Sequence, residues 1–320
     1  HQLFPDITVS KPDSAASEID HVVLLRENRR SHPKICEVSE RVNRSTRHTA
    51  EHLVAELPRT TAEESSLTES DGCWLCELTE PRPEPWRRVL DRWAMRHYLS
   101  PLNGGLNYME LAEHAAAAKN LSAPEIAPHL DALFEVLNSA RVLTLLRGGP
   151  WGCEGVNRHI AEALMPGARA VLFSGAPVLI TANDYVQQLF NGDVGIALAV
   201  PDRGVRVIFQ RHASTTERYL EIPLSALKSF EYAFALTVHK SQGSEYGEIL
   251  LPIPPQGAER LMNKQMIYTA LTRAKRRAVF CGSAERLAAG IARRLDRHSG
   301  LSAPVAAEGA APIAQQGLLF

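Results

Sequence analysis

The residues most able to do chemistry are concentrated in Phe234–Glu245, which reads F-A-L-T-V-H-K-S-Q-G-S-E. The stretch begins as an apolar run, typical of a buried strand, and becomes polar at His239 and Lys240. Ligands of open α/β sheets bind beside strand ends. A loop there can offer backbone N–H groups to a phosphate, with Gly243 free to adopt a positive φ. The alternative is an ordinary polar loop, since one glycine alone does not define a phosphate site.

Two further clusters could meet an anion. In the helix predicted at Asn263–Arg273, Thr269 and Arg273 are four residues apart and therefore share a face. A guanidinium held in this way can stabilise the charge on a transferring phosphoryl group. Basic residues also gather at Arg26–Arg30, between a predicted strand and a helix for which Ser31 is the expected N-cap. A solvated basic turn is the alternative there.

The elements that position these residues follow from hydrophobic periodicity. Apolar runs typical of buried strands alternate with amphipathic helices over most of the chain, which predicts an α/β fold. From Arg169 the pattern changes to short strands separated by turns, which predicts a small antiparallel barrel inserted into that fold. The barrel strands are expected at Val171–Phe173, Val178–Thr181, Val194–Ala199, Val205–Phe209 and Tyr219–Ile222. The α/β strands are expected at Val22–Leu25, Cys73–Leu78, Arg141–Arg147, Ile249–Ile253 and Ala278–Gly282, and the helices at Trp86–Tyr98, Ala123–Ala140, Val156–Leu164 and Ala284–Arg297.

Composition excludes several classes of protein. The chain has 320 residues, of which 45% are hydrophobic and 22% charged, and its net charge is −1. This composition is that of an ordinary globular protein, and the length predicts about two domains. Any nucleic-acid site must therefore come from local placement of charge. No apolar run approaches the roughly 18 residues that span a bilayer, so no membrane association is expected. Five scattered cysteines indicate reduced thiols and a cytoplasmic setting. Cys73 and Cys76 have metal-ligand spacing, but no second pair completes a site, so no metal site is predicted.

Two of these stretches together resemble a known family. Thr237–Glu245 and Tyr268–Lys275, the latter reading Y-T-A-L-T-R-A-K, are similar to motifs V and VI of superfamily 1 DNA helicases, closest to the RecD type. The run G-P-W-G-C-E-G-V-N at Gly149–Asn157 and the segment Gly175–Leu198 also resemble that type. Leu25–Arg30 looks like motif IV, although Arg29 stands where the family usually has an aromatic residue.

The resemblance implies the second RecA-like (P-loop NTPase-like) domain of a helicase, with an SH3-like barrel inserted. Residues 1–168 and 233–298 would form the RecA-like domain, 169–232 the barrel, and 299–320 a flexible tail. In the family, ATP with Mg²⁺ binds between two RecA-like domains, single-stranded DNA crosses both, and stepping runs 5′ to 3′. Carried over, the catalytic contacts to the γ-phosphate are Arg30 and Arg273, the other nucleotide contacts are Gln242, Gly243, Glu245 (on the ribose) and Tyr268, and the DNA contacts are Thr237, His239 and Asn183.

Two motifs of the family that bind phosphate and Mg²⁺ are missing from this sequence. The sequence contains no G-x-x-x-x-G-K-S/T phosphate loop and no paired acidic motif for Mg²⁺. This absence and the lack of an initiator Met predict a chain cut from something longer, which alone does not hydrolyse ATP. Gln2 is either the end of the preceding domain's last motif or a linker residue.

Three readings of the whole protein remain open. The first is a subunit that works with RecB and RecC in exodeoxyribonuclease V, a helicase–nuclease of double-strand break repair and recombination. The second is a stand-alone or relaxase-linked helicase. The third is a non-catalytic DNA-binding or scaffold module. Intact Arg30, Glu245 and Arg273 argue against the scaffold.

The C-terminus carries a further motif. Gln316, Leu319 and Phe320 form Q-x-x-L-F, which resembles the peptide that docks on the bacterial β sliding clamp. A flexible tail can present Leu319 and Phe320 as apolar anchors. A chance match in a low-complexity tail is the alternative.

Overall fold

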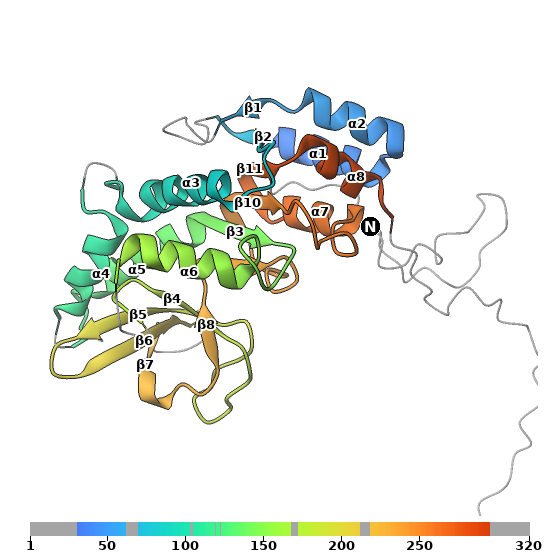
Figure 1. The fold of residues 1–320 in the computed structure, drawn as a ribbon. Helices are drawn as coiled ribbons and strands as arrows, with labels where there is room; N and C mark the ends of the chain where they lie inside the picture. Colours follow the sequence, from blue (N-terminus) through green and yellow to red (C-terminus); the bar gives the residue numbers. More distant parts are fainter. Residues whose placement is uncertain are drawn as a thin grey trace, which may run out of the picture. The chain divides into compact units, whose positions relative to one another are not determined.

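Two β-sheets organise the part of the chain that the computed structural model describes (Figure 1). That part comprises residues 31–61, 70–102, 105–118, 120–121, 123–167, 172–211 and 218–294. The larger sheet has six strands in the order β1-β2-β11-β10-β3-β9, and every pairing in it is parallel. Its strands are β1 (Arg59–Thr60), β2 (Gly72–Glu77), β3 (Ala140–Thr144), β9 (Ala235–Thr237), β10 (Tyr246–Ile253) and β11 (Ala274–Gly282). The predicted α/β fold is confirmed.

Helices cover both faces of this sheet, because each carries an apolar stripe at helical spacing. One face packs against α1 (Pro33–Arg44), α2 (Arg47–Glu56), α7 (Lys264–Leu271) and α8 (Ala284–Ala292). The other packs against α3 (Pro83–Ala94), α5 (Ala127–Ser139) and α6 (Cys153–Leu164), with α4 (Tyr108–Ala116) beyond them. A π-helical turn, Met95–Leu99, extends α3. Within the described residues, no helix is both long enough and apolar enough to cross a membrane.

The smaller sheet is antiparallel, in the order β7-β6-β5-β4-β8. Its strands are β4 (Pro177–Ile180), β5 (Val194–Val200), β6 (Gly204–Gln210), β7 (Tyr219–Pro223) and β8 (Phe230–Tyr232), with a short 3₁₀ turn at Leu224–Ala226. Leu172 and Phe173 form no strand, so the prediction of a strand there was wrong, and β8 is the fifth strand instead. Over the residues described, no pairing joins β7 to β8, so the closed barrel stays a prediction.

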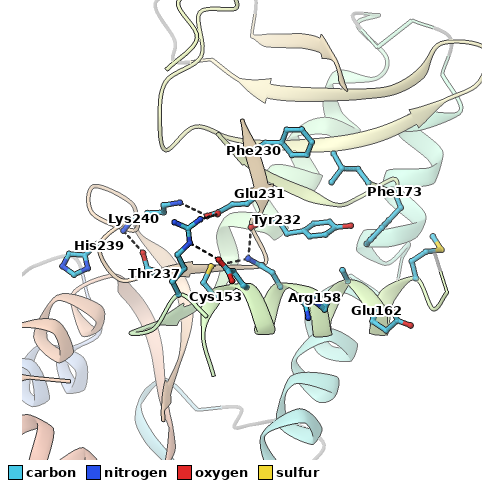
Figure 2. A pocket seen from close by; sticks show the side chains of 16 residues that line it. Cys153, Arg158, Glu162, Phe173, Phe230, Glu231, Tyr232, Thr237, His239 and Lys240 are labelled. Carbon is cyan, nitrogen blue, oxygen red and sulfur yellow. Dashed lines mark hydrogen bonds and ion pairs between the residues drawn. The ribbon is translucent and has the colours of Figure 1, made fainter. Parts of the chain in front are cut away.

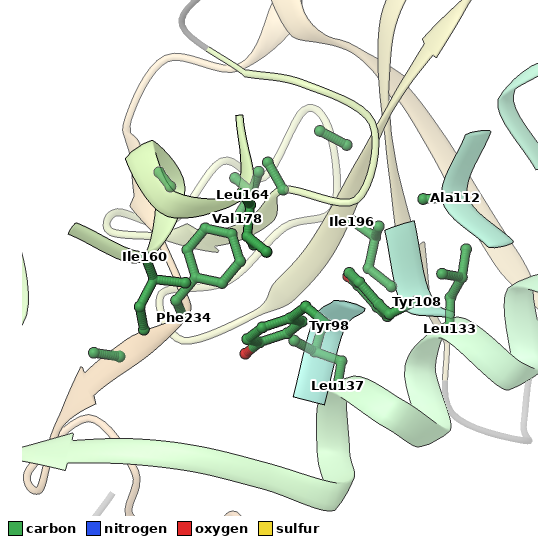
Figure 3. Packing of buried hydrophobic residues seen from close by; sticks show 14 of the residues in the cluster. Tyr98, Tyr108, Ala112, Leu133, Leu137, Ile160, Leu164, Val178, Ile196 and Phe234 are labelled. Carbon is green, nitrogen blue, oxygen red and sulfur yellow. The ribbon is translucent and has the colours of Figure 1, made fainter. Parts of the chain in front are cut away.

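The two sheets share one hydrophobic core. Phe234 lies between β8 and β9, is fully buried, and contacts Tyr98 edge-on with ring centroids 5.4 Å apart. Figure 3 shows it with Val178 of β4 and Ile160 of α6, while Tyr108 lies near Ile196 of β5. The chain therefore passes from the small sheet into the large one without leaving the core.

Several local predictions are corrected by the structure. The N-cap of α1 is His32 rather than Ser31, since the His32 ring nitrogen accepts from the Lys34 amide. The helix α2, for which no prediction was made, buries Ala50, Leu53 and Val54 at helical spacing. The helices expected at Trp86–Tyr98 and Ala123–Ala140 are amphipathic as predicted, and their aromatic residues Trp86, Trp93 and Phe134 are all buried.

Candidate functional site

The loop 238–245 joins the end of β9 to the start of β10 and is held by its own backbone. The amide of Ser241 donates to the carbonyl of Thr237 at 3.1 Å, and its hydroxyl donates to Val238 at 2.8 Å. The amide of Ser244 donates to Ser241 at 3.0 Å. Gly243 has φ +88°, as predicted, and open space where a side chain would lie. The fixed turn therefore leaves Gly243 exposed for the close approach of a ligand.

Arg273, just after α7, is held against this loop. Its Nε donates to the carbonyl of Thr269 at 3.3 Å, and its Nη2 donates to the hydroxyl of Thr272 at 3.2 Å. Its Nη1 donates to the carbonyl of Ser244 at 3.2 Å. The amide of Tyr246 returns a hydrogen bond of 2.8 Å to the carbonyl of Arg273. The two stretches singled out from the sequence are therefore adjacent, with the guanidinium fixed by its fork of donors.

Other predicted nucleotide residues surround this contact. Glu245 pairs with Lys275 at 3.4 Å and is partly exposed. Gln242 is exposed on the turn. Tyr268 is half-buried on α7, where burial and the Glu40 carboxylate raise the pKa of its hydroxyl against the opposing charge of Arg273. The amide of His32 donates to the carbonyl of Lys275 at 2.6 Å, which brings the start of α1 beside the predicted nucleotide residues. Arg30 and Gln2 lie outside the described residues.

The predicted DNA residues Thr237 and His239 lie on a different surface, at a cavity of about 650 Å³. The cavity lies between α6 and the small sheet, as Figure 2 shows, with Thr237 and His239 at one end of it. His239 is exposed, and the Thr237 hydroxyl accepts from the amide of Lys240 at 3.4 Å. The same loop thus turns one end towards this cavity and its other end towards Arg273.

Ion pairs fasten the mouth of this cavity. The Lys240 ammonium lies 2.7 Å from Glu231 of β8, and Arg147 lies 3.8 Å from the same carboxylate. Arg147 also donates to Glu154 at 3.0 Å. Glu154 and Glu231 raise the pKa of Arg147, and exposure of its side chain keeps the stabilising energy of these pairs small. The loop 238–245 is thereby tied to the small sheet.

Asn183 does not join the other predicted DNA residues. It lines a separate hollow of about 350 Å³ beside Lys228, and it is not among the residues that line the larger cavity. Its side-chain oxygen accepts from the amide of Asn191 at 2.8 Å, and its amide donates to the Tyr185 hydroxyl at 3.2 Å. Within the described residues it therefore shapes its own loop.

Asn157 is an important residue to which the sequence argument gave no role. Its side-chain amide donates to the carbonyls of Tyr232 and Ala235 at 2.8 and 3.1 Å, and its oxygen accepts from the amide of Ala235 at 2.7 Å. The buried Cys153 thiol also donates to the carbonyl of Ala235, and burial raises the pKa of this thiol to about 12. Asn157 ends the G-P-W-G-C-E-G-V-N run, and this position was the available clue to its role.

The last predicted features are the metal ligands and the C-terminal motif. Across the ranges described, no three His, Cys, Asp or Glu side chains gather as metal ligands. Gln316, Leu319 and Phe320 lie outside the described residues.

Comparison with known proteins finds likenesses over the same part of the chain. Residues 232–281, which carry the loop and Arg273, match the model of the UvrD-like helicase C-terminal domain. The RecBCD enzyme subunit RecD of Mycobacterium tuberculosis is 37% identical over 175 residues, which are 53% of this chain and 29% of that protein. The matched part of the chain is similar to helicases of the RecD type. What it matches is the C-terminal portion of such proteins.

Two further likenesses extend the comparison. The ATP-dependent RecD2 DNA helicase of Deinococcus radiodurans is 32% identical over 152 residues, which are 46% of this chain and 20% of that helicase. The match thus covers less than a third of either relative. Among solved structures, Pif1 helicase from Bacteroides in complex with ADP-AlF3 and ssDNA overlaps 65% of this chain and 52% of its own, with TM-score 0.31 and 14% identity, too distant to assign a fold.

Proposed function

We propose that this RecD-type chain forms the second RecA-like half of an ATP-dependent DNA helicase, with an SH3-like barrel inserted at residues 169–232. The observation that carries the proposal is the hydrogen bond from Arg273 to the carbonyl of Ser244, which joins the end of α7 to the loop 238–245. A fixed cation beside an exposed glycine at φ +88° suits a phosphoryl group.

In the proposed reaction, the terminal phosphate of ATP approaches Arg273 and Arg30. Their positive charges offset the negative charge that develops as the phosphoryl group is transferred. Arg273 needs little reorganisation for this, because helix and loop carbonyls already hold its guanidinium. Glu245 exchanges its ion pair with Lys275 for a hydrogen bond from the ribose. The remaining nucleotide contacts are assigned to Gln242, Gly243 and Tyr268.

The other half of the nucleotide site belongs to a first RecA-like domain. That domain supplies the phosphate loop and the ligands of Mg²⁺, which the present 320 residues do not contain as sequence motifs. The metal, when bound there, neutralises charge on the phosphates. This chain alone is accordingly proposed to be inactive as an ATPase.

Single-stranded DNA is the proposed polymer substrate, contacted by Thr237 and His239, with Asn183 as a more distant contact. Thr237 and Arg273 are linked through the short loop 238–245, so a change at the phosphate can reach the DNA contacts through a few bonds. The proposed stepping direction is 5′ to 3′.

The relatives support two settings for this motor. One relative is a RecBCD enzyme subunit, which favours a cytoplasmic helicase–nuclease with RecB and RecC, the exodeoxyribonuclease V of double-strand break repair and recombination. Another is an ATP-dependent DNA helicase, which favours a stand-alone enzyme. Co-purification of the native protein with two large subunits selects the first setting, and its isolation alone selects the second.

Binding measurements on the chain test the proposal. A fluorescent oligothymidylate should bind with an affinity that falls as salt rises, because phosphate contacts release counterions. Thr237→Ala together with His239→Ala should weaken binding about thirtyfold, since each removes a contact of roughly 1 kcal/mol. Arg211→Ala, which removes a partly exposed cation just after β6 and away from the loop, is the control. Unchanged binding by the double variant would reject the DNA contacts, and DNA-stimulated ATP turnover by the chain alone would reject the divided site.

A second proposed contact is the C-terminal Q-x-x-L-F with the β sliding clamp. A peptide covering Ala314–Phe320 should bind purified clamp, and a peptide with Leu319→Ala and Phe320→Ala should not, because both apolar anchors are removed. Equal binding of the two peptides in a titration by calorimetry would remove this partner.

A further inference from the structure

Arg141, the second residue of β3, carries a positive charge inside the protein and is only 1% exposed. Its Nη2 donates to the carbonyl of Leu137 at 3.1 Å, and its Nη1 donates to the carbonyl of Ala233. Leu137 lies in the last turn of α5, where carbonyls have no partner in the helix and the helix dipole is negative. A buried charge is costly unless it is hydrogen-bonded, so the guanidinium holds these two carbonyls in place.

The same guanidinium lies over an aromatic ring. The Cζ atom of Arg141 is 5.0 Å from the ring centroid of Tyr246, which is buried, and a cation over a ring face is attracted to it. Ala233 immediately precedes the stretch Phe234–Glu245, and Tyr246 immediately follows it. One side chain therefore contacts both ends of the stretch that contains the loop 238–245.

Each end of this stretch is fastened to a different part of the molecule. The amide of Ala233 donates to the carbonyl of Pro177, the first residue of β4, at 2.9 Å. The amide of Tyr246 donates to the carbonyl of Arg273 at 2.8 Å. Arg141 thus connects the small sheet with the arginine proposed to meet the γ-phosphate, through one residue on each side.

We infer that Arg141 is a positioning residue of the proposed motor, which keeps Ala233 and Tyr246 at a fixed separation and thereby keeps Arg273 in place for the γ-phosphate. The inference rests on the proposed ATPase reaction. A charge stabilises a transition state only where its position matches the developing charge, so loss of Arg141 should lower kcat rather than weaken the binding of ATP. A planar guanidinium can meet two carbonyls and a ring at once, which a lysine cannot.

The test uses this chain assembled with the domain that supplies the phosphate loop, and it measures ATP turnover. Arg141→Met keeps a long, unbranched side chain but removes the charge and every donor. Its kcat should fall roughly tenfold to a hundredfold, because displacing a group by about 1 Å can cost this much. The KM for ATP and the Kd for an oligothymidylate should both stay within about twofold of wild type.

A double-mutant cycle with Arg273→Lys separates positioning from a general loss of structure. If Arg141 acts by placing Arg273, then Arg141→Met should cost less than about twofold once Arg273→Lys has removed the fork of donors. A structural defect would instead cost the same factor in both backgrounds. Leu75→Ala is the control, since it opens the core on β2, two strands from β10, and should lower stability to urea without changing kcat.

Tyr246→Leu provides a second variant, which decides the question if Arg141→Met does not fold. It removes only the ring under the guanidinium and should lower kcat about threefold, again without adding to Arg273→Lys.

The outcomes distinguish the inference from the function on which it rests. No turnover by the wild-type assembly would reject both. Wild-type turnover with an unchanged kcat in Arg141→Met, or with equal losses in the two Arg273 backgrounds, would overturn the positioning role and leave the proposed function standing.

Discussion

Arg273 is the residue at which the sequence argument and the geometry agree most closely. Its position four residues after Thr269 predicted the helix face, and the structure adds hydrogen bonds to Thr269, Thr272 and Ser244. The last of these contacts joins residues 29 positions apart, and helical spacing cannot predict it. Only the fold of β10 beside β11 brings Ser244 to this guanidinium.

Arg273→Lys separates charge from geometry. Lysine keeps the positive charge but cannot reproduce the planar fork of donors. In an assembly of this chain with the domain that supplies the phosphate loop, ATP turnover should fall about a thousandfold or more, the range known for such arginines. Binding of single-stranded DNA should not change. Arg276→Lys, at an exposed neighbour on β11, is the control and should keep full turnover in a coupled ATPase assay. Loss of turnover by less than about threefold would show that the fork geometry is dispensable.

Gly243 and Gly257 form a matched pair for a second prediction. Their φ values are +88° and +80°, and neither has a neighbour within 4 Å of the place of a Cβ. Each change to Ala should therefore lower the free energy of unfolding by about 1 kcal/mol through backbone strain alone. Urea denaturation measures this cost. Only Gly243→Ala should impair ATP turnover in the complete assembly, and equal turnover by the two variants would detach Gly243 from the nucleotide.

At the scale of elements, the most informative contact is the one between α6 and β9. Asn157 uses both donor and acceptor atoms on the first residue of β9, which fixes where the loop 238–245 begins. The helix and the strand were each predicted from apolar periodicity, because local pattern decides both. Their junction was not, because it depends on a polar pair 78 residues apart that no period records.

The π-helical turn after α3 gives a prediction about pH. It places His97 under β10 and β11, 11% exposed, against the Trp93 ring at 4.2 Å. Burial, with the nearby charges of Arg96 and Arg277, lowers the pKa of His97 from 6.5 to about 3. The contact of 3.9 Å from His97 to Glu248 is therefore no ion pair at neutral pH, and burial also raises the pKa of Glu248.

The sign of the effect follows from the lowered pKa. The unfolded chain binds a proton at His97 below about pH 6.5 and the folded chain does not until about pH 3, so stability is complete above 6.5 and is lost as the pH falls through this window. Between pH 7.5 and 5, wild type should lose on the order of 2 kcal/mol more than His97→Gln. Urea titrations at both pH values measure the difference. The exposed His48→Gln variant should behave as wild type, and parallel losses in all three proteins would exclude a buried neutral His97.

At the scale of the molecule, composition and pattern were sufficient for an α/β fold with an antiparallel insertion, since strand and helix periods differ. They did not reveal how the parts share a core. Phe234 was read as the start of a strand, yet its ring joins Tyr98, Phe173 and Tyr232, which belong to three separate segments. The order of strands in the large sheet was equally hidden, because the parallel neighbours β2 and β11 are far apart in sequence.

The shared core leads to a prediction about cooperativity. If the small sheet were an independent insertion, it would unfold separately; with Phe234 and Val178 in one buried cluster, both sheets should unfold together. Hydrogen exchange followed by mass spectrometry in rising urea should give amides of β5–β6 and of β10–β11 the same free energy of opening. Phe234→Leu removes ring contacts to both sheets and should lower the free energy of opening of β5–β6 and of β10–β11 equally. The matched control is Ile249→Val, a core change on the opposite face of the large sheet, away from the small sheet. Earlier exchange of β5–β6, with β10–β11 still protected, would mean that the core is divided at Ala233 and that residues 169–232 form a domain in their own right.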